Sequence, residues 1–337
     1  MKDFEIDILV DLIVDRARID TTFPDPKNQW VGWLTDVLFQ IVDRFVAIDL
    51  NDPKTFAEIG RRVSLRVRDL PEMGALACLA ILRGERLLPV SPEREEFVLQ
   101  IARETKNIIT NLPDSTRKLR LESLFYYHMG IFYSNYEHFD LAEEAQRKSA
   151  EIATIIGDKT GAAIAYFMET LCQLRNALLK GIETKEIFSE LEKRFLILVD
   201  ATKGSSVEVQ WGQINGPIHM IETTIWLNQM SNPDLKNWVA MVIAAADRMT
   251  GSSEIATSAE FVRAIDIYSK GDPNAFEVLR AVGEGKDANE VKVTALLVLI
   301  RHAIRAQKID EAKDILKQMP KQEAQHVRAI AERMLSK

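Results

Sequence analysis

The chain has 337 residues, of which 47% are hydrophobic, and its 43 basic and 50 acidic side chains leave a formal charge of −7. The apolar fraction is enough for a sizeable core and excludes an intrinsically disordered chain. The negative balance argues against a nucleic acid or an anionic membrane as a partner, because both attract basic surfaces.

The N-terminal sequence, MKDFEIDILVDLIVDRARID, predicts an amphipathic helix rather than an export signal. Aspartates interrupt its apolar residues, which the core of a signal peptide does not allow, so we expect a cytoplasmic location. Asp3, Asp7, Asp11 and Asp15 recur every fourth residue and therefore share one helix face. We interpret this face as exposed to solvent, with binding of a basic partner as the alternative.

Residues 53–70 predict a helix that carries arginines at positions 61, 62, 66 and 68. Glu58, Asp69 and Glu72 adjoin these arginines. We therefore interpret the cluster as a solvated helix face, and phosphate contacts are the alternative.

Prolines and glycines divide the remaining sequence into helices, about sixteen in all. Ser91 before Pro92 and Asp272 before Pro273 predict helix starts, because each provides a capping oxygen ahead of a proline at the first helical position. Residues 203–217 are predicted as a loop, since their one strand-like run, SVEVQW, has no partner strand. Trp211 in this loop either serves a function or fills a gap between helices.

Turn-forming residues recur near positions 137, 181, 232, 271 and 308, at intervals of about 40 residues. A two-helix unit of this length does not cover its own apolar face and stacks on a neighbour. We therefore predict an all-α protein with an N-terminal helical bundle at residues 1–112 and a helical repeat region at residues 113–337. Residues 322–335 are the predicted C-terminal capping helix.

The hairpin at residues 121–156 contains a glycine where its two helices are predicted to cross. Ala142 and Ala145 on the second helix are expected to face Gly130, because small residues let two helix backbones approach closely. We expect Gly130→Leu to destabilise this crossing and Gln146→Ala to have almost no effect.

The residues of this hairpin resemble a tetratricopeptide repeat, in which aromatic and small side chains alternate around the helix crossing. The repeat positions are occupied here by Tyr126, Met129, Gly130, Tyr133 and Ala142. The resemblance covers about residues 121–166, and a weaker one covers residues 300–320. It implies a right-handed α-solenoid of degenerate tetratricopeptide-like hairpins that follows the N-terminal bundle.

In this family the first helix of each hairpin lines a concave groove for a peptide or a partner's helix. The corresponding positions in this chain are Tyr127, Ile131, Asn135, Phe167, Leu171 and Arg175. The resemblance thus implies a non-enzymatic scaffold or adaptor for protein partners that needs no cofactor, and it specifies no oligomeric state. One alternative is a peptide-responsive regulatory sensor whose N-terminal bundle moves. Another, RNA binding through pentatricopeptide-like repeats, is disfavoured by the charge.

No catalytic or metal-binding motif stands out in the sequence. A Glu-x-x-His step that ends at His326, and the pair His219 and Glu222, are interpreted as exposed groups on helix surfaces. Cys78 and Cys172 stand in apolar helical sequence, which predicts buried and reduced thiols. The last alternative is an enzyme with an unrecognised helical active site, which predicts carboxylates of shifted pKa in a buried polar pocket.

Overall fold

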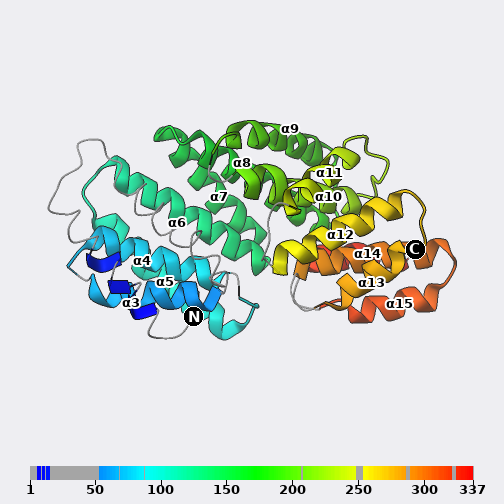
Figure 1. Ribbon diagram of the computed structural model, residues 1–337, viewed down its shortest axis with the longest axis horizontal. Helices are drawn as coiled ribbons and strands as arrows, with labels where there is room; N and C mark the ends of the chain where they lie inside the picture. Colours follow the sequence, from blue (N-terminus) through cyan, green and yellow to red (C-terminus); the bar gives the residue numbers. More distant parts are fainter. Residues whose placement is uncertain are drawn as a thin grey trace. The chain divides into compact units, whose positions relative to one another are not determined.

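A computed structural model describes residues 6–8, 10–11, 13–15, 53–67, 69–86, 88–205, 208–247, 253–285, 289–320 and 324–336. Every regular element within these ranges is a helix, which confirms the predicted all-α class. The chain divides into two compact units, Met1–Ala165 and Tyr166–Lys337, and each is described by itself. Figure 1 shows the order of their helices.

The first unit begins with helical residues between positions 6 and 15. Its further helices are α3 (Pro53–Arg66), α4 (Pro71–Glu85), α5 (Pro92–Asn111), α6 (Thr116–Asn135), α7 (Phe139–Ile155) and the start of α8 (Lys159–Lys180). The second unit contains the rest of α8 and then α9 (Lys185–Thr202), the π-helix η2 (Glu208–Asn215), α10 (Gly216–Trp226), α11 (Leu235–Ala246), α12 (Ser253–Ser269), α13 (Ala275–Glu284), α14 (Asn289–Arg305), α15 (Ile309–Gln318) and α16 (Gln325–Leu335). The predicted division at residue 112 lies in the α5–α6 connection and stays a prediction.

The connections between helices confirm the predicted turns. Positions 137, 181, 232, 271 and 308 all lie between two consecutive helices. The backbone is left-handed at Glu137, Gly181 and Gly271, a conformation that ends a helix and redirects the chain. Consecutive helices are packed in pairs, as in α6 with α7, α12 with α13, and α14 with α15.

The two predicted helix starts have different outcomes. The Ser91 hydroxyl accepts a hydrogen bond from the Arg94 amide at 3.3 Å, so α5 is capped as predicted. The start predicted at Pro273 is wrong, because α13 begins at Ala275. Asp272 instead accepts a hydrogen bond from the amide of Asn274 at 2.9 Å, which holds these residues in a turn before the helix.

The core of the first unit is formed where α4 packs against α3, α5 and α6, and α6 packs against α7. Apolar side chains at helical spacing fill it, and the N-terminal helical residues contribute to the same cluster. Its fully or almost fully buried members include Val10, Val63, Val67, Met73, Leu82, Val98, Leu121 and Phe132.

The α6–α7 crossing confirms a close approach at Gly130 but changes its partner. A Cβ atom at this glycine would lie only 2.4 Å from Nε2 of Gln146, and the next nearest atoms also belong to Gln146. The Gln146 side chain is fully buried, and its amide donates a hydrogen bond to the Tyr127 carbonyl oxygen at 3.2 Å. The expectation that Gln146 is dispensable is therefore wrong.

Gln146→Ala is expected to destabilise the first unit by about 1 kcal/mol, because the Tyr127 carbonyl loses its donor and the core loses buried atoms. Urea unfolding followed by circular dichroism measures the change. Gln100→Ala is the matched control, since Gln100 is exposed on α5 and its replacement is expected to stay within about 0.5 kcal/mol. Equal effects of the two substitutions would contradict the crossing described here.

His128 on α6 is a buried titratable group of the same unit. Burial lowers its pKa well below the usual 6.5, and the charges of Arg86 and Arg83 lower it further. The folded state therefore keeps His128 neutral, whereas the unfolded chain takes up a proton as the pH falls through 6.5. Stability contributed by this residue is present above that pH and is lost below it.

We expect the first unit to lose about 1 kcal/mol of stability through His128 between about pH 7 and about pH 5.5. Denaturant unfolding of the wild type and of His128→Asn at both pH values measures this contribution as a difference. The variant is expected to lose less stability on acidification. The same acid-induced loss in both proteins would show that His128 does not carry it.

The second unit has a central helix, α14, which contacts α10, α12, α13, α15 and α16. Its middle part, VTALLVLI, is apolar on all sides apart from Thr294, and the residues from Val293 to Ile300 are buried. A helix without a polar face is stable only where neighbours cover it on every side. One of these neighbours is α16, whose bounds nearly coincide with those of the capping helix predicted at residues 322–335.

The loop predicted at residues 203–217 is confirmed at residues 203–205 and wrong from residue 208 on, because residues 208–215 form a π-helix that leads directly into α10. Two glycines allow this segment to approach α9. A Cβ at Gly212 would lie 2.5 Å from Thr202 Oγ1, and one at Gly216 would lie 3.1 Å from the Phe195 ring. Trp211 is buried here, which favours its interpretation as a residue that fills a gap.

Candidate functional site

The predicted groove positions on α6 lie beside the C-terminal end of α4. The Arg86 guanidinium stands over the Tyr127 ring at 5.4 Å from its centroid. The Asn135 side chain donates a hydrogen bond to the Arg86 carbonyl oxygen at 2.7 Å. Tyr127 and Ile131 are half-buried and Asn135 is exposed. These three residues keep some accessible surface, and their role in partner binding stays a prediction.

The predicted groove positions on α8 are buried in the second unit. Phe167 and Leu171 are fully buried, and only 5% of Arg175 is exposed. Phe167 contacts the Phe195 ring, at 6.2 Å between centroids. These side chains are part of the interior in this conformation, so the structure does not present them to a partner. Their position in the repeat pattern could not reveal this, since it depends on what packs against α8.

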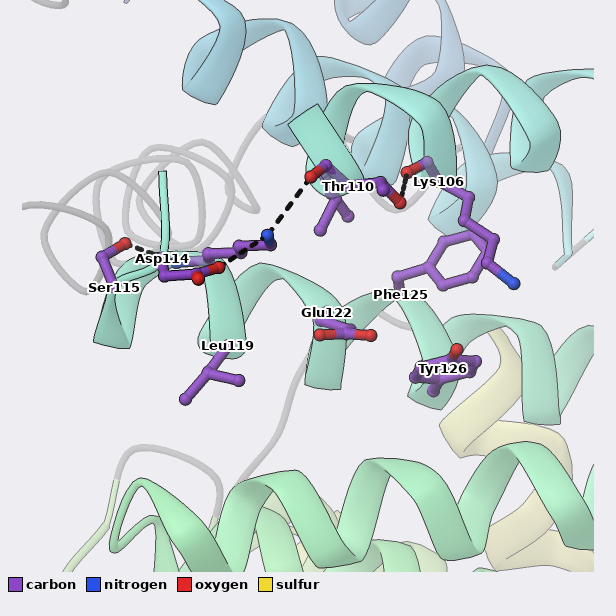
Figure 2. Close-up of a pocket in the computed structure, with 10 residues that line it drawn as sticks. Lys106, Thr110, Asp114, Ser115, Leu119, Glu122, Phe125 and Tyr126 are labelled. Carbon is purple, nitrogen blue, oxygen red and sulfur yellow. Dashed lines mark hydrogen bonds and ion pairs between the residues drawn. The ribbon is translucent and has the colours of Figure 1, made fainter. Parts of the chain in front are cut away.

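An accessible groove lies instead between α5 and α6, and none of the predicted groove positions lines it (Figure 2). It has a volume of about 490 Å³. Buried Ile109 and Phe125 lie at its base, and Leu119 and Tyr126 are half-buried along it. Its polar lining consists of Lys106, Thr110, Asp114, Ser115, Lys118 and Glu122. The sequence does not reveal this groove, because its two sides come from different helices whose packing cannot be derived from local residue patterns.

A second feature with chemical potential is a polar cluster inside the second unit, contributed by α8, α10, α14 and α16. His219 and Glu222 lie one turn apart on α10, with Nδ1 and Oε2 separated by 3.2 Å. Glu290 on α14 accepts a hydrogen bond from Arg175 at 2.5 Å, and its other oxygen lies 3.3 Å from His326 Nε2. One ligand atom from each of His219, Glu222 and Glu290 lies within 4.8 Å of the others.

The surroundings give the two carboxyl groups opposite protonation behaviour. Burial raises the pKa of Glu222, and the neighbouring Glu290 raises it further, against the weaker effects of His219 and Arg175. Burial alone would also raise the pKa of Glu290, but Arg175 and then His326 outweigh it and hold this pKa at about 2. Glu290 is therefore ionised at neutral pH, whereas loss of a proton from Glu222 is disfavoured by its surroundings.

Burial also lowers the pKa of His326, although Glu290 acts in the opposite direction. The imidazole packs edge to face against Trp226, with 4.8 Å between ring centroids. The Trp226 indole in turn donates a hydrogen bond to Thr294 Oγ1 at 2.9 Å. The cluster is thus held in place by packed and hydrogen-bonded neighbours from three helices.

Both histidine interpretations from the sequence are therefore wrong. His326 is buried instead of lying on a solvated helix face, and Glu222 beside His219 is almost completely buried as well. His219 and Glu222 do form a pair on one face of α10, as their spacing of three residues predicted. The available signal was the apolar sequence around Glu222, GPIHMIETTIW, which leaves little polar surface for a solvent-facing side.

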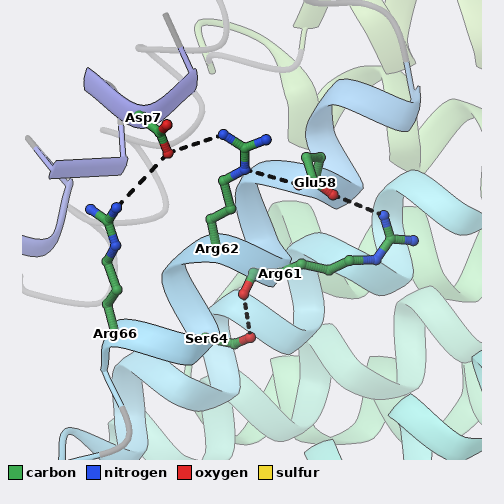
Figure 3. Close-up of polar contacts among 6 residues, drawn as sticks. All are labelled: Asp7, Glu58, Arg61, Arg62, Ser64 and Arg66. Carbon is green, nitrogen blue, oxygen red and sulfur yellow. Dashed lines mark hydrogen bonds and ion pairs between the residues drawn. The ribbon is translucent and has the colours of Figure 1, made fainter. Parts of the chain in front are cut away.

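The acidic stripe at the N-terminus and the arginines of α3 keep much of their side-chain surface exposed, as predicted, and they also pair with each other. Asp7 accepts a hydrogen bond from Arg62 at 3.0 Å and also pairs with Arg66 (Figure 3). Arg66 pairs with Asp11 as well. Arg61 is bonded to Glu58 and Glu85. The two oppositely charged faces therefore contact each other, which weakens the alternatives of a basic partner and of phosphate contacts. Asp3 and Arg68 lie outside the described residues.

Comparisons with protein-family models, with curated proteins and with solved structures give no match. The resemblance to tetratricopeptide repeats gains no support from them. What the structure establishes is the coarser statement, an all-helical chain whose consecutive helices are packed in pairs.

Two simpler predictions can also be assessed. Cys78 and Cys172 are both buried and form no disulfide, as predicted, and burial raises the pKa of Cys78 to about 11. A thiol of this kind stays protonated and unreactive at neutral pH. Among the described residues, no helix combines the length and the apolar character needed to cross a membrane.

Proposed function

We propose that this chain is a helical-repeat scaffold that binds a peptide segment of a partner protein in the groove between α5 and α6. The proposal includes the finer architecture implied by the repeat resemblance, a right-handed stack of tetratricopeptide-like hairpins. The paired helices and the tight crossing at Gly130 support this architecture. The groove is the observation that carries the functional proposal.

The groove suits a short peptide with one or two apolar side chains. Its base of Ile109 and Phe125 offers apolar contact, and its volume of about 490 Å³ is in the range of sites that enclose such groups. Polar groups along the groove can bond the backbone of an extended segment. The charged lining side chains are two lysines and two acids, and Lys118 is paired with Asp114 at 2.9 Å. A peptide without a strong net charge therefore fits best.

Selection of peptides from a random displayed library on the immobilised full-length chain tests the proposal. Leu119→Ala and Tyr126→Ala are expected to weaken the selected peptides at least about tenfold, as loss of a well-packed apolar contact does. Ile155→Ala is the matched control, because Ile155 is a highly exposed apolar residue on α7, away from the groove lining. Selected peptides that bind all three variants like the wild type would refute the proposed groove.

The buried polar cluster favours one of the alternatives, an enzyme with a helical active site. That alternative predicts carboxyl groups whose pKa values are shifted apart inside the protein, and Glu222 and Glu290 behave in this way. Ion-pair networks without a catalytic role also shift pKa values, so the scaffold remains the proposed function. Hydrolase substrate panels assayed on the wild type and on Glu222→Gln would detect an activity that depends on the cluster.

A further inference from the structure

His219, Glu222 and Glu290 bring three metal-ligating side chains to one point in the second unit. Around a zinc ion with bonds of about 2.0–2.2 Å, neighbouring ligand atoms lie about 3.3–3.6 Å apart. The 3.2 Å between His219 Nδ1 and Glu222 Oε2 is close to this spacing. One ligand atom of each of the three side chains lies within 4.8 Å of the other two, so the three are gathered around one point.

A separate observation indicates that the cluster lacks a component. Glu222 is 99% buried, since only 1% of its side chain is exposed, and its Oε1 atom has no hydrogen-bond partner among the described residues. A buried carboxylate oxygen without a partner costs free energy, so such groups are paired or bind metals. Glu222 lies directly among the other potential ligands, and an ion there would satisfy it.

The charges of the cluster suit a divalent cation. Once a bound cation has displaced the proton of Glu222, the carboxylates of Glu222 and Glu290 and the guanidinium of Arg175 give a formal charge of −1 with neutral imidazoles. Arg175 and His326 both contact Glu290 from the side and orient its carboxyl group. Carboxylates that bind a metal commonly accept hydrogen bonds of this kind from residues that do not themselves touch the metal.

We propose that His219, Glu222 and Glu290 bind one divalent metal ion, zinc or a first-row transition metal with similar ligand preferences. An imidazole nitrogen and carboxylate oxygens are suitable ligands for zinc, and three protein ligands leave a fourth position for water or another group. The His219 and Glu290 side chains are 20% and 26% exposed, which gives a route from solvent. The inference does not depend on the proposed groove, which lies in the other unit.

Zinc titration of the full-length chain, stripped of metal with a chelator, tests the site. Competition with a fluorescent zinc indicator measures affinity and stoichiometry, and cobalt provides an absorption spectrum that reports the coordination geometry. We expect one equivalent of zinc, a tetrahedral or five-coordinate cobalt spectrum, and a rise in Tm on zinc addition. Glu222→Gln is expected to weaken zinc binding at least tenfold, because it replaces a ligand oxygen while preserving the side-chain shape.

His138→Ala is the matched control, since His138 lies 2.9 Å from Glu95 in an exposed pair of the first unit. It is expected to keep the full zinc stoichiometry. His219→Ala serves as a second ligand variant if Glu222→Gln does not fold, with circular dichroism as the check. Absence of zinc binding in the wild type would overturn the proposal and leave the cluster a purely structural network. Equal affinity in the wild type and in a folded ligand variant would also overturn it.

Discussion

Replacement of Arg175 by methionine is expected to destabilise the second unit by about 3–5 kcal/mol. Arg175 is 95% buried, and the 2.5 Å bond from its guanidinium to Glu290 provides the main charge compensation for that carboxylate. Loss of the arginine leaves an uncompensated charge in the interior, although Glu290 keeps some contact with solvent. Guanidinium chloride unfolding in the presence of a chelator measures the effect without a contribution from metal.

Two further variants make this prediction specific. Arg263→Met removes an arginine from an exposed pair, whose partner Asp247 lies 2.6 Å away, and is expected to cost less than about 1 kcal/mol. Arg175→Met combined with Glu290→Gln removes both charges and is expected to recover at least half of the lost stability. A double variant as unstable as Arg175→Met alone would show that the charge of Glu290 is not the cause.

The same experiment bears on the predicted role of Arg175 as a partner contact. A residue that acts by stabilising the interior changes the unfolding midpoint, whereas a surface contact changes binding with little effect on stability. For Arg175→Met we expect a changed unfolding midpoint. Reduced peptide binding at unchanged stability would instead support Arg175 as part of a groove that is open in solution.

Gly60→Ala is expected to destabilise the first unit by about 1–3 kcal/mol. A methyl group on this residue of α3 would lie 2.8 Å from the carbonyl oxygen of Ala77 and 3.0 Å from the amide nitrogen of Ile81. Both are backbone atoms of α4, so the clash is relieved only if the two helices move apart. Urea unfolding of the purified variant measures the change in free energy.

Gly74→Ala provides the opposite control within the same pair of helices. The nearest atom to a Cβ at Gly74 is the terminal methyl group of Ile108, at 3.9 Å, which is ordinary contact. Alanine is favoured over glycine inside a helix, so this substitution is expected to stabilise the unit by about 0.5–1 kcal/mol. Destabilisation by both substitutions, or by neither, would contradict the tight α3–α4 crossing.

Local sequence signals predicted the helices and their connections well. The hairpin over residues 121–156 corresponds to α6 and α7, and all five predicted turn positions lie between helices. These features depend on neighbouring residues, such as a left-handed glycine or a serine cap, and on apolar spacing that fits 3.6 residues per turn. The π-helix at residues 208–215 was missed because glycines and a short apolar alternation resemble a loop until α9 packs against them.

The candidate sites depend on contacts between residues that are far apart in the sequence. Gly130 was identified as a close-packed position, but the identity of Gln146 as its neighbour follows from the rotation of α7 against α6. His219 and Glu222 were recognised as a pair, whereas Glu290 and His326, which join them, are separated from them by several helices. Spacing along one helix carries no information about what another helix places opposite it.

The sequence by itself determined that this chain is all-helical and where its helical hairpins turn, because backbone geometry and hydrophobic periodicity are local. Only the tertiary structure decided which polar side chains are buried and with whom they pair. Arg175 illustrates the difference. In the sequence it occupies a position expected to face a partner, and in the folded chain it lies in the interior beside Glu290. Burial is a property of the packing around a residue, and that packing is set by helices distant in the chain.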